Sequence, residues 1–379
     1  MRKVEDEDEA GGKTERVIRH FFNCTSPAAL PTIPRMVQTT AAPEPCVEPT
    51  DFKDTCLKAY RWMLLARTAE DRIANLYRGG KIIGGVFLGK GQEALSASIG
   101  VALRDGDIFA PLIRDQAGRF AFGEALLDYT RTYLGSRLGP MLGRDGNIHR
   151  GRPREGYYAM ISHLGAMIPT VAGALMARRF QGLTGAVGAT CLGEGGTSTG
   201  AFHEGLNLAA VEKLPLIVVV ANNQYAYSTP NARQFACRHL VDKAIGYGVE
   251  GHTVDGTDLA ACLTVVGRAV ERARSGHGPQ LVVATLLRLV GHGEHDDASY
   301  VDPRLKQSAT GRDCLKLAEQ RFLSEGWTDA ATLRQWQTEA SEQVEAAVAT
   351  TIREPLPDPD EEDWCALSNR HLTDGFSGE

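Results

Sequence analysis

Apolar residues follow two kinds of pattern along this chain, a helical stripe near its start and short buried strands further on. Between residues 57 and 77, apolar side chains recur three or four positions apart, as one face of a helix requires. Gly79 and Gly80 would end that helix. Residues 216–221 (LIVVVA) form a continuous apolar run, which is typical of a strand buried on both faces.

From residue 160 onward, predicted strands and helices alternate. The expected strands are 188–192, 216–221, 252–254 and 280–286. The expected helices are a first one beginning at Thr50 or Asp51, then 92–103, 168–180, 199–212, 234–245, 258–274, 310–325 and 329–352. Alternation of this kind predicts an α/β fold, a parallel sheet with helices on both faces. Ligands on such sheets bind beyond the carboxyl ends of the strands.

The two ends of the chain differ in composition from its middle. Residues 5–9 are acidic, and residues 27–49 are rich in Pro, Thr and Ala, so neither stretch can bury much apolar surface. We expect a flexible tail over 1–50, one α/β domain over 51–355 and an extension over 356–379. The tail has neither the charge order of a secretory signal nor the basic character of a mitochondrial transit peptide.

Composition excludes several classes of protein. The 379 residues are 43% hydrophobic and 23% charged, which is ordinary for a globular protein. The apolar run at 216–221 is too short to cross a bilayer, and a net charge of −6 offers nucleic acid no general attraction. The 8 cysteines contain no C-x-x-C, which argues against a disulfide scaffold or zinc finger and favours a cytoplasmic location.

The candidate chemistry lies between residues 193 and 230. Glu194 follows the strand predicted at 188–192, and Asn223 follows the strand at 216–221. Because the carboxyl ends of parallel strands meet at one edge of a sheet, a carboxylate, an amide oxygen and loop carbonyls should converge there. These hard oxygen ligands suit Mg²⁺ or Ca²⁺ better than zinc.

Glycines beside these residues indicate a phosphate group. Gly193, Gly195 and Gly196 allow the backbone to approach a ligand, and residues 197–199 open a helix whose N-terminus favours negative charge. The spacing is not the G-x-G-x-x-G of a dinucleotide site, and the G-K-[ST] of a nucleotide-binding loop is absent. The residues therefore predict a magnesium–diphosphate site and argue against a nicotinamide-dependent Rossmann enzyme.

The order G-E-G, helix, strand, N-N resembles the thiamine-diphosphate motif. The flanking HEGLNLAA and NNQYAYSTP are similar to the alpha chain of the decarboxylating component of 2-oxo acid dehydrogenase complexes, a family that includes pyruvate, branched-chain and acetoin dehydrogenases. The resemblance covers residues 55–355 and implies a thiamin diphosphate-binding fold. It also includes the runs GKGQEALSASIGVALRDGD, FAPLIRDQAG, GRDGNIH, ISHLGAMIPTVAGA, YGVEGHTVDGTD and RLVGHGEHDDASY.

This resemblance implies a set of site residues. It implies that Mg²⁺ is bound by the side-chain oxygens of Glu194 and Asn223 and by the Tyr225 carbonyl, and that His292 is catalytic beside the reacting carbon. The residues implied to bind thiamine diphosphate are Arg114, His149, Ser162, Leu164, Gly193, Glu194, Gly195, Gly196, Asn223, Tyr225 and Ala226.

The implied reaction is the oxidative decarboxylation of a 2-oxo acid, with reductive transfer of the acyl group to a lipoyl group on the acyltransferase of the complex. In the family, the glutamate that activates the cofactor comes from a separate beta chain, which implies an alpha2beta2 heterotetramer. Two alternatives remain open: another thiamine enzyme, such as one that cleaves acetoin, and a subunit that binds the cofactor without turnover.

Several positions depart from the family pattern. Ile113 stands where tyrosine is usual, and Ala221 stands where branched-chain enzymes often have arginine. Gly293 replaces a serine that is commonly phosphorylated. Phe87 replaces a histidine of pyruvate-type chains, which favours a branched substrate.

The acidic and histidine-rich run 292–297 could hold a transition metal, but it lacks the H-x-x-E-H spacing of a zinc hydrolase.

Overall fold

The computed structural model describes residues 49–146 and 149–361. Its main feature is a five-stranded parallel sheet with the strand order β1-β2-β3-β7-β6. The strands are β1 (Ile108–Ala110), β2 (Gly188–Gly193), β3 (Leu216–Asn222), β6 (Glu250–Asp255) and β7 (Gln280–Thr285). The predicted α/β fold is confirmed. Most of the predicted tail and of the predicted C-terminal extension lies outside the described residues.

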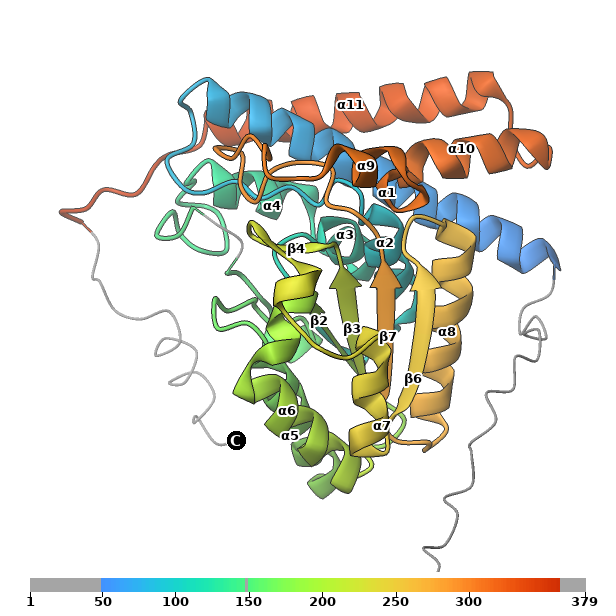
Figure 1. The fold of residues 1–379 in the computed structure, drawn as a ribbon. Helices are drawn as coiled ribbons and strands as arrows, with labels where there is room; N and C mark the ends of the chain where they lie inside the picture. Colours follow the sequence, from blue (N-terminus) through green and yellow to red (C-terminus); the bar gives the residue numbers. More distant parts are fainter. Residues whose placement is uncertain (1–48, 147–148, 362–379) are drawn as a thin grey trace, which may run out of the picture. The chain divides into compact units, whose positions relative to one another are not determined.

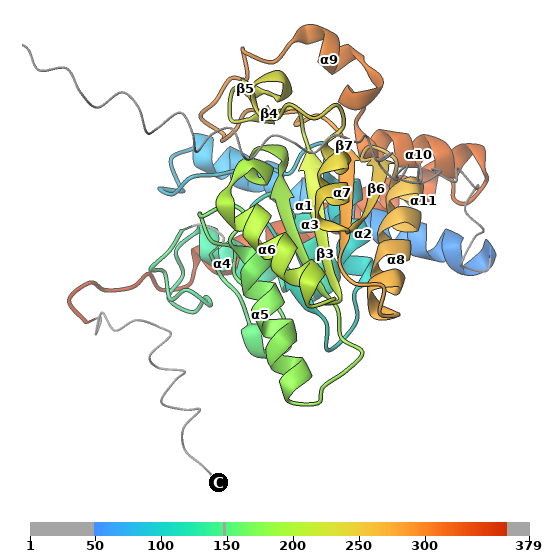
Figure 2. The same ribbon diagram turned by 60° about the horizontal axis from the view of Figure 1, so that its bottom comes forward.

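Helices cover both faces of this sheet (Figures 1 and 2). One face packs against α5 (Met167–Phe180), α6 (Gly200–Val211) and α7 (Lys243–Tyr247). The other packs against α2 (Glu93–Ala102) and α8 (Leu259–Arg274). A further apolar cluster joins α1 (Pro49–Arg78) to α3 (Gln116–Phe122), α4 (Leu126–Tyr133), α10 (Cys314–Ser324) and α11 (Ala330–Ile352). The apolar run of β3 is therefore buried from both sides, as its sequence predicts.

Glycines allow α2 and α3 to cross closely. A Cβ atom at Gly100 would lie 2.3 Å from the Gly118 carbonyl oxygen, and one at Gly118 would lie 2.5 Å from the Ser96 carbonyl oxygen. The Gly118 amide also donates to the Ser96 hydroxyl at 2.8 Å. This close packing fixes the start of α3, which directly follows the segment that carries Arg114.

The sequence pattern is wrong over 234–245, where it predicts one helix. The structure has two short turns, Asn231–Arg233 and Leu240–Asp242, followed by the five-residue α7. The Gln234 carbonyl accepts from the Ser198 hydroxyl at 2.9 Å, so a tertiary contact replaces a hydrogen bond of the helix there. Strand β1 and helices α3 and α4 were not predicted. Elements of 3 to 8 residues are too short to show a clear period in their apolar positions.

Within 49–146 and 149–361, no helix has both the length and the apolar character needed to cross a bilayer.

A buried ion pair ties the start of β1 to α8. The Asp107 carboxylate accepts hydrogen bonds from both terminal nitrogens of Arg274 at 2.9 and 2.8 Å, and from the Val187 amide at 2.9 Å. We predict that Asp107→Ala lowers the free energy of unfolding by roughly 3 kcal/mol, because Arg274 then keeps only the Gly185 carbonyl and the more distant Glu271, and the Val187 amide loses its acceptor. Urea denaturation measures this loss.

The control is Glu271→Ala, which removes the more distant carboxylate, 3.6 Å from Arg274 and 70% exposed. Its expected effect is below about 0.5 kcal/mol. Equal losses in the two variants would contradict the role assigned to Asp107.

Candidate functional site

Glu194 and Asn223 meet at the carboxyl edge of the sheet, as predicted. Gly193 pairs with Ala221 in the ladder between β2 and β3, so the residues that follow the two strands stand at the same level. The Glu194 carboxylate accepts a hydrogen bond from the backbone amide of Asn223 at 3.1 Å, and the side chains of both residues are buried. Burial raises the pKa of Glu194, and nearby donors only partly offset this.

Tyr225 lies in a short antiparallel ribbon beside this edge, formed by β4 (Tyr225–Ala226) and β5 (Thr229–Pro230). Its amide faces the Asn223 side-chain oxygen at 3.3 Å, and its carbonyl accepts from Arg288 at 3.2 Å. A carbonyl has two lone pairs, so the Tyr225 oxygen can still bind a cation. The carboxylate, the amide and this carbonyl therefore supply the hard oxygen donors that Mg²⁺ prefers.

The glycine-rich loop follows β2 as a single 3₁₀ turn, η3 (Glu194–Ser198). A Cβ atom at Gly195 would lie 2.6 Å from the Ala226 Cβ, so this glycine lets the ribbon pack closely on the loop. A Cβ atom at Gly193 would meet no atom within 4 Å, which leaves space beside the predicted diphosphate site. A Cβ atom at Gly196 would lie 3.0 Å from the Cδ1 atom of Leu192.

Arg114 and His292, which are 178 residues apart in sequence, lie in direct contact. One terminal nitrogen of Arg114 donates to the His292 carbonyl at 2.6 Å and lies 3.3 Å from the His292 Nδ1. The other terminal nitrogen donates to the Leu88 carbonyl at 3.0 Å. A small cavity of about 30 Å³ is lined by Arg114 together with Gly193 and Asn223, so the two halves of the site adjoin.

Burial and nearby positive charges lower the pKa of His292. Burial, followed by the positive charges of Arg114 and Arg288, lowers its pKa from 6.5 to about 4. The pKa of Arg114 is itself lowered to about 10 by burial and by Arg288. A neutral imidazole at pH 7 can accept a proton or donate a hydrogen bond, as acid–base chemistry beside a reacting carbon requires.

Ser162, Leu164 and His149 are the remaining predicted site residues. The Ser162 hydroxyl lies 3.3 Å from His149 Nε2, and His149 Nδ1 lies 3.0 Å from the Asp145 carboxylate. Ser162 and Leu164 are exposed. A Cβ atom at the neighbouring Gly165 would lie 2.6 Å from the Thr199 hydroxyl and 3.6 Å from the Gly196 carbonyl oxygen, so this loop adjoins the glycine-rich loop.

Sequence reasoning missed two residues that hold these parts together. Arg288 is buried and donates to the carbonyl oxygens of Tyr225 and Tyr227 and to the Tyr300 hydroxyl. Gln234 donates to the Glu194 carboxylate at 3.2 Å. Arg288 begins the run RLVGH, and Gln234 falls in a segment predicted as helix. No sequence pattern therefore marks either residue as part of the site.

Glu70 is a third missed residue, buried within the apolar stripe of α1. Both of its oxygens accept from the Gly89 amide, at 3.0 and 2.9 Å. Burial, with a contribution from Glu93, raises the pKa of Glu70 to about 8. A Cβ atom at Gly89 would lie 2.3 Å from the Arg114 carbonyl oxygen, so Glu70 holds the loop against which the Arg114 segment packs.

The run 292–297 has a structural role. The Asp296 carboxylate accepts from the His292 amide and the Tyr300 hydroxyl, each at 2.6 Å. Among the residues that the structure describes, no three His, Cys, Asp or Glu side chains gather as a transition-metal site would require. These contacts fix the loop that presents His292.

Comparison of the sequence with known proteins identifies the family that this chain resembles. Residues 60–360 match the family described as the dehydrogenase E1 component. One relative is the alpha subunit of acetoin:2,6-dichlorophenolindophenol oxidoreductase from Cupriavidus necator, 35% identical over 82% of this chain and 93% of the relative. Another is the alpha subunit of the pyruvate dehydrogenase E1 component from Rhizobium meliloti, 31% identical over 82% and 89%. A third, the 2-oxoisovalerate dehydrogenase alpha subunit from Bacillus subtilis, is 38% identical over 70% and 81%.

We predict that Arg114→Met raises the pKa of His292 by about one unit from its value of about 4, because a positive charge beside the ring is removed. A histidine with a lowered pKa destabilises the folded state as the pH falls from 6.5 towards 4, since the unfolded chain then binds the extra proton. The variant should therefore lose less stability across this window. An NMR titration of the His292 ring measures the shift.

The matched control is Arg304→Met, which removes a guanidinium that is 90% exposed and paired with Asp302. It should leave the His292 titration unchanged. An unaltered titration in Arg114→Met would show that this guanidinium does not set the proton affinity of the ring.

Proposed function

This chain belongs to the dehydrogenase E1 component family of oxidoreductases, and from that premise we propose that it is the alpha subunit of a 2-oxo acid dehydrogenase complex that uses thiamine diphosphate and Mg²⁺. The reaction would be oxidative decarboxylation of a 2-oxo acid, with reductive acyl transfer to a lipoyl group of the acyltransferase. The family depends on thiamine diphosphate in general.

One observation carries this proposal. Glu194, Asn223 and Tyr225 lie together at the ends of β2 and β3, joined by hydrogen bonds from the Asn223 and Tyr225 backbone amides, while Arg114 lines a cavity with Gly193 and Asn223 and also contacts His292. Oxygen donors for a cation, a guanidinium for an anion and a neutral imidazole are thus grouped in one place.

Each residue would have a defined task. Glu194, Asn223 and the Tyr225 carbonyl would hold Mg²⁺, and Arg114 with the glycine-rich loop would hold the diphosphate. Thiamine diphosphate supplies the electron sink for decarboxylation when it is bound. His292, held by Arg114 and Asp296, would accept or donate a proton beside the reacting carbon.

The proposal includes a partner. The relatives are named alpha subunits, which supports a beta chain and an alpha2beta2 assembly in which the site is shared. We place the assembly in the cytoplasm. Full decarboxylation of 2-oxo acids by the purified alpha chain alone would refute the shared site.

A branched-chain 2-oxo acid is the substrate that the site residues favour. The Phe87 and Tyr227 rings lie 5.4 and 4.4 Å from the His292 ring, so apolar surface flanks the proposed reacting position. The relatives are named for acetoin, pyruvate and 2-oxoisovalerate at similar identities, so the choice rests on these side chains. Acetoin is the second candidate, since the acetoin relative covers more of this chain than the 2-oxoisovalerate relative.

We predict that Glu194→Ala weakens Mg²⁺-dependent binding of thiamine diphosphate at least about tenfold, because it removes the only carboxylate of the proposed ligand set. Isothermal titration of the alpha–beta complex measures the dissociation constant without turnover. Glu342→Ala, on the exposed side of α11, is the control and should bind normally. Unchanged affinity in Glu194→Ala would refute the metal assignment.

For substrate choice, Phe87→Ala should lower kcat/KM for 3-methyl-2-oxobutanoate about tenfold and change pyruvate less, because lost apolar contact penalises the branched acid more. Steady-state assays with both acids and acetoin, using a lipoyl acceptor, measure this. Phe180→Ala, at a ring 77% exposed on α5, serves as the control. A wild-type preference for pyruvate or acetoin would overturn the branched-chain assignment.

A further inference from the structure

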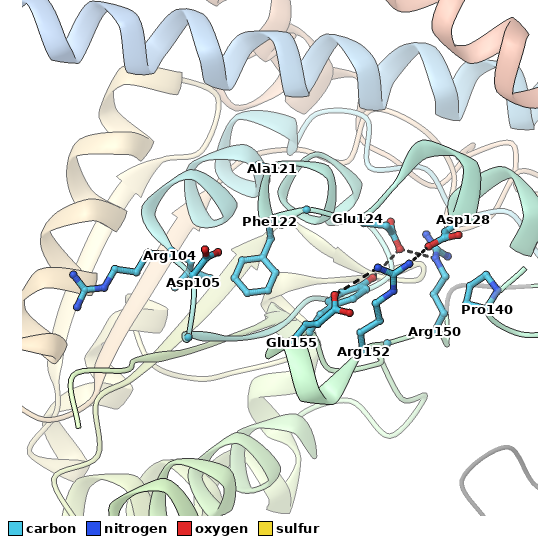
Figure 3. A pocket seen from close by; sticks show the side chains of 15 residues that line it. Arg104, Asp105, Ala121, Phe122, Glu124, Asp128, Pro140, Arg150, Arg152 and Glu155 are labelled. Atoms are coloured by element: carbon cyan, nitrogen blue, oxygen red, sulfur yellow. Dashed lines mark hydrogen bonds and ion pairs between the residues drawn. The ribbon is translucent and has the colours of Figure 1, made fainter. Parts of the chain in front are cut away.

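A second pocket lies away from the proposed active site, beside the amino end of β1 (Figure 3). Its volume is about 440 Å³, which is within the range of small-molecule sites. Its wall is formed by residues 103–106 before β1, by 121–124 at the end of α3, and by Asp128, Pro140, Arg150, Gly151, Arg152, Glu155 and Tyr157. None of the residues assigned to thiamine diphosphate or Mg²⁺ lines it.

One wall of this pocket carries a buried guanidinium, that of Arg150, which is only partly paired and whose Cζ lies 5.6 Å from the centroid of the Tyr129 ring. Arg150 is only 2% exposed, and its Nε lies 2.5 Å from a Glu124 oxygen. Within the described part of the chain, neither terminal nitrogen of Arg150 has a hydrogen-bond partner. Burial favours a neutral Glu124, yet Arg150 and then Arg119 hold its pKa below the usual range, so two guanidinium groups act on this one carboxylate.

The Glu124 carboxylate has few lone pairs left for Arg150. It also accepts hydrogen bonds from the Gln116 side chain at 2.7 Å and from the Tyr157 hydroxyl at 3.0 Å. Buried donors without acceptors cost free energy, and an incoming carboxylate would supply the acceptors that Arg150 lacks once the side chains that cover its terminal nitrogens move aside.

At the rim of the pocket, carboxylates outnumber guanidinium groups. Arg152 is paired with both Asp128 and Glu155, so two carboxylates face one guanidinium. Figure 3 shows these three side chains next to one another, close to Arg150 and Glu124. The Glu155 carboxylate is 3.5 Å from Arg152 and 66% exposed, which leaves it available to a second cation.

Apolar side chains complete the wall. Phe122, Leu103, Ala121 and Pro140 line the pocket between and beside these charges. A simple anion such as phosphate would meet the two rim carboxylates, and a simple amine would meet the buried guanidinium. The arrangement is complementary to a molecule that carries a carboxylate and an ammonium group close together, with a side chain for the apolar wall.

We propose that this pocket binds a free α-amino acid, with its carboxylate on Arg150 and its ammonium group between Asp128 and Glu155. The proposal stands apart from the proposed function, since it uses none of the same residues.

The test is isothermal titration of the full-length protein with glycine, L-alanine, L-leucine and L-phenylalanine. At least one should bind saturably at millimolar concentration or below. For L-leucine, the two matched probes are 4-methylpentanoate, which lacks the amine, and 3-methylbutylamine, which lacks the carboxylate. Each should bind at least about tenfold more weakly than the amino acid, because each leaves one charged end of the pocket unmatched.

Two variants separate the ends of the pocket. Arg150→Met should weaken amino-acid binding at least about tenfold, and Glu155→Gln several-fold. Glu155 is exposed, so its variant keeps the test valid if loss of the buried Arg150 unfolds the protein. Glu345→Gln is the matched control, since this acid is 60% exposed and paired with Arg72 on another face.

Three results would overturn the proposal. The first is that none of the four amino acids binds in the millimolar range. The second is that 4-methylpentanoate or phosphate binds as tightly as the best amino acid, which would make the pocket a simple anion site. The third is that Glu155→Gln binds like the Glu345→Gln control.

Discussion

The pairing of β2 with β3 is the constraint on which the site depends. Because Gly193 stands opposite Ala221, the next residues of both strands emerge at one level, and Glu194 reaches the Asn223 amide. A slip of one residue would turn each side chain to the other face of the sheet. Such a slip is prevented by the burial of β3 between α5 and α6 on one side and α2 and α8 on the other.

Around this edge, buried charges are held largely by backbone oxygens. Arg114 donates to two carbonyls, those of Leu88 and His292, and Arg288 donates to those of Tyr225, Tyr227 and Val290. Carbonyl oxygens orient a guanidinium without neutralising it. The positive charge therefore remains available to an anion, and together with burial, the larger cause, it lowers the pKa of His292.

The sequence predicted the parts of this molecule that have a strong local pattern. The run 216–221, the long helices and the residues that follow β2 and β3 all lie where the pattern placed them. Arg288, Gln234 and Glu70 could not be identified in this way, because each acts through a contact with a residue distant in sequence. The helix predicted near 234–245 failed for the same reason, since contacts with η3 outweigh local preference there.

The contact between Arg114 and His292 also bears on how this protein folds. It joins residues 178 positions apart and closes a chain segment that includes β2, β3, β6 and β7. Contacts of such long sequence separation form late, because the entropy of closing a large loop must be met before they stabilise anything. We therefore expect the G-E-G…N-N segment to assemble from neighbouring elements before the imidazole reaches its place, which requires most of the domain to have condensed.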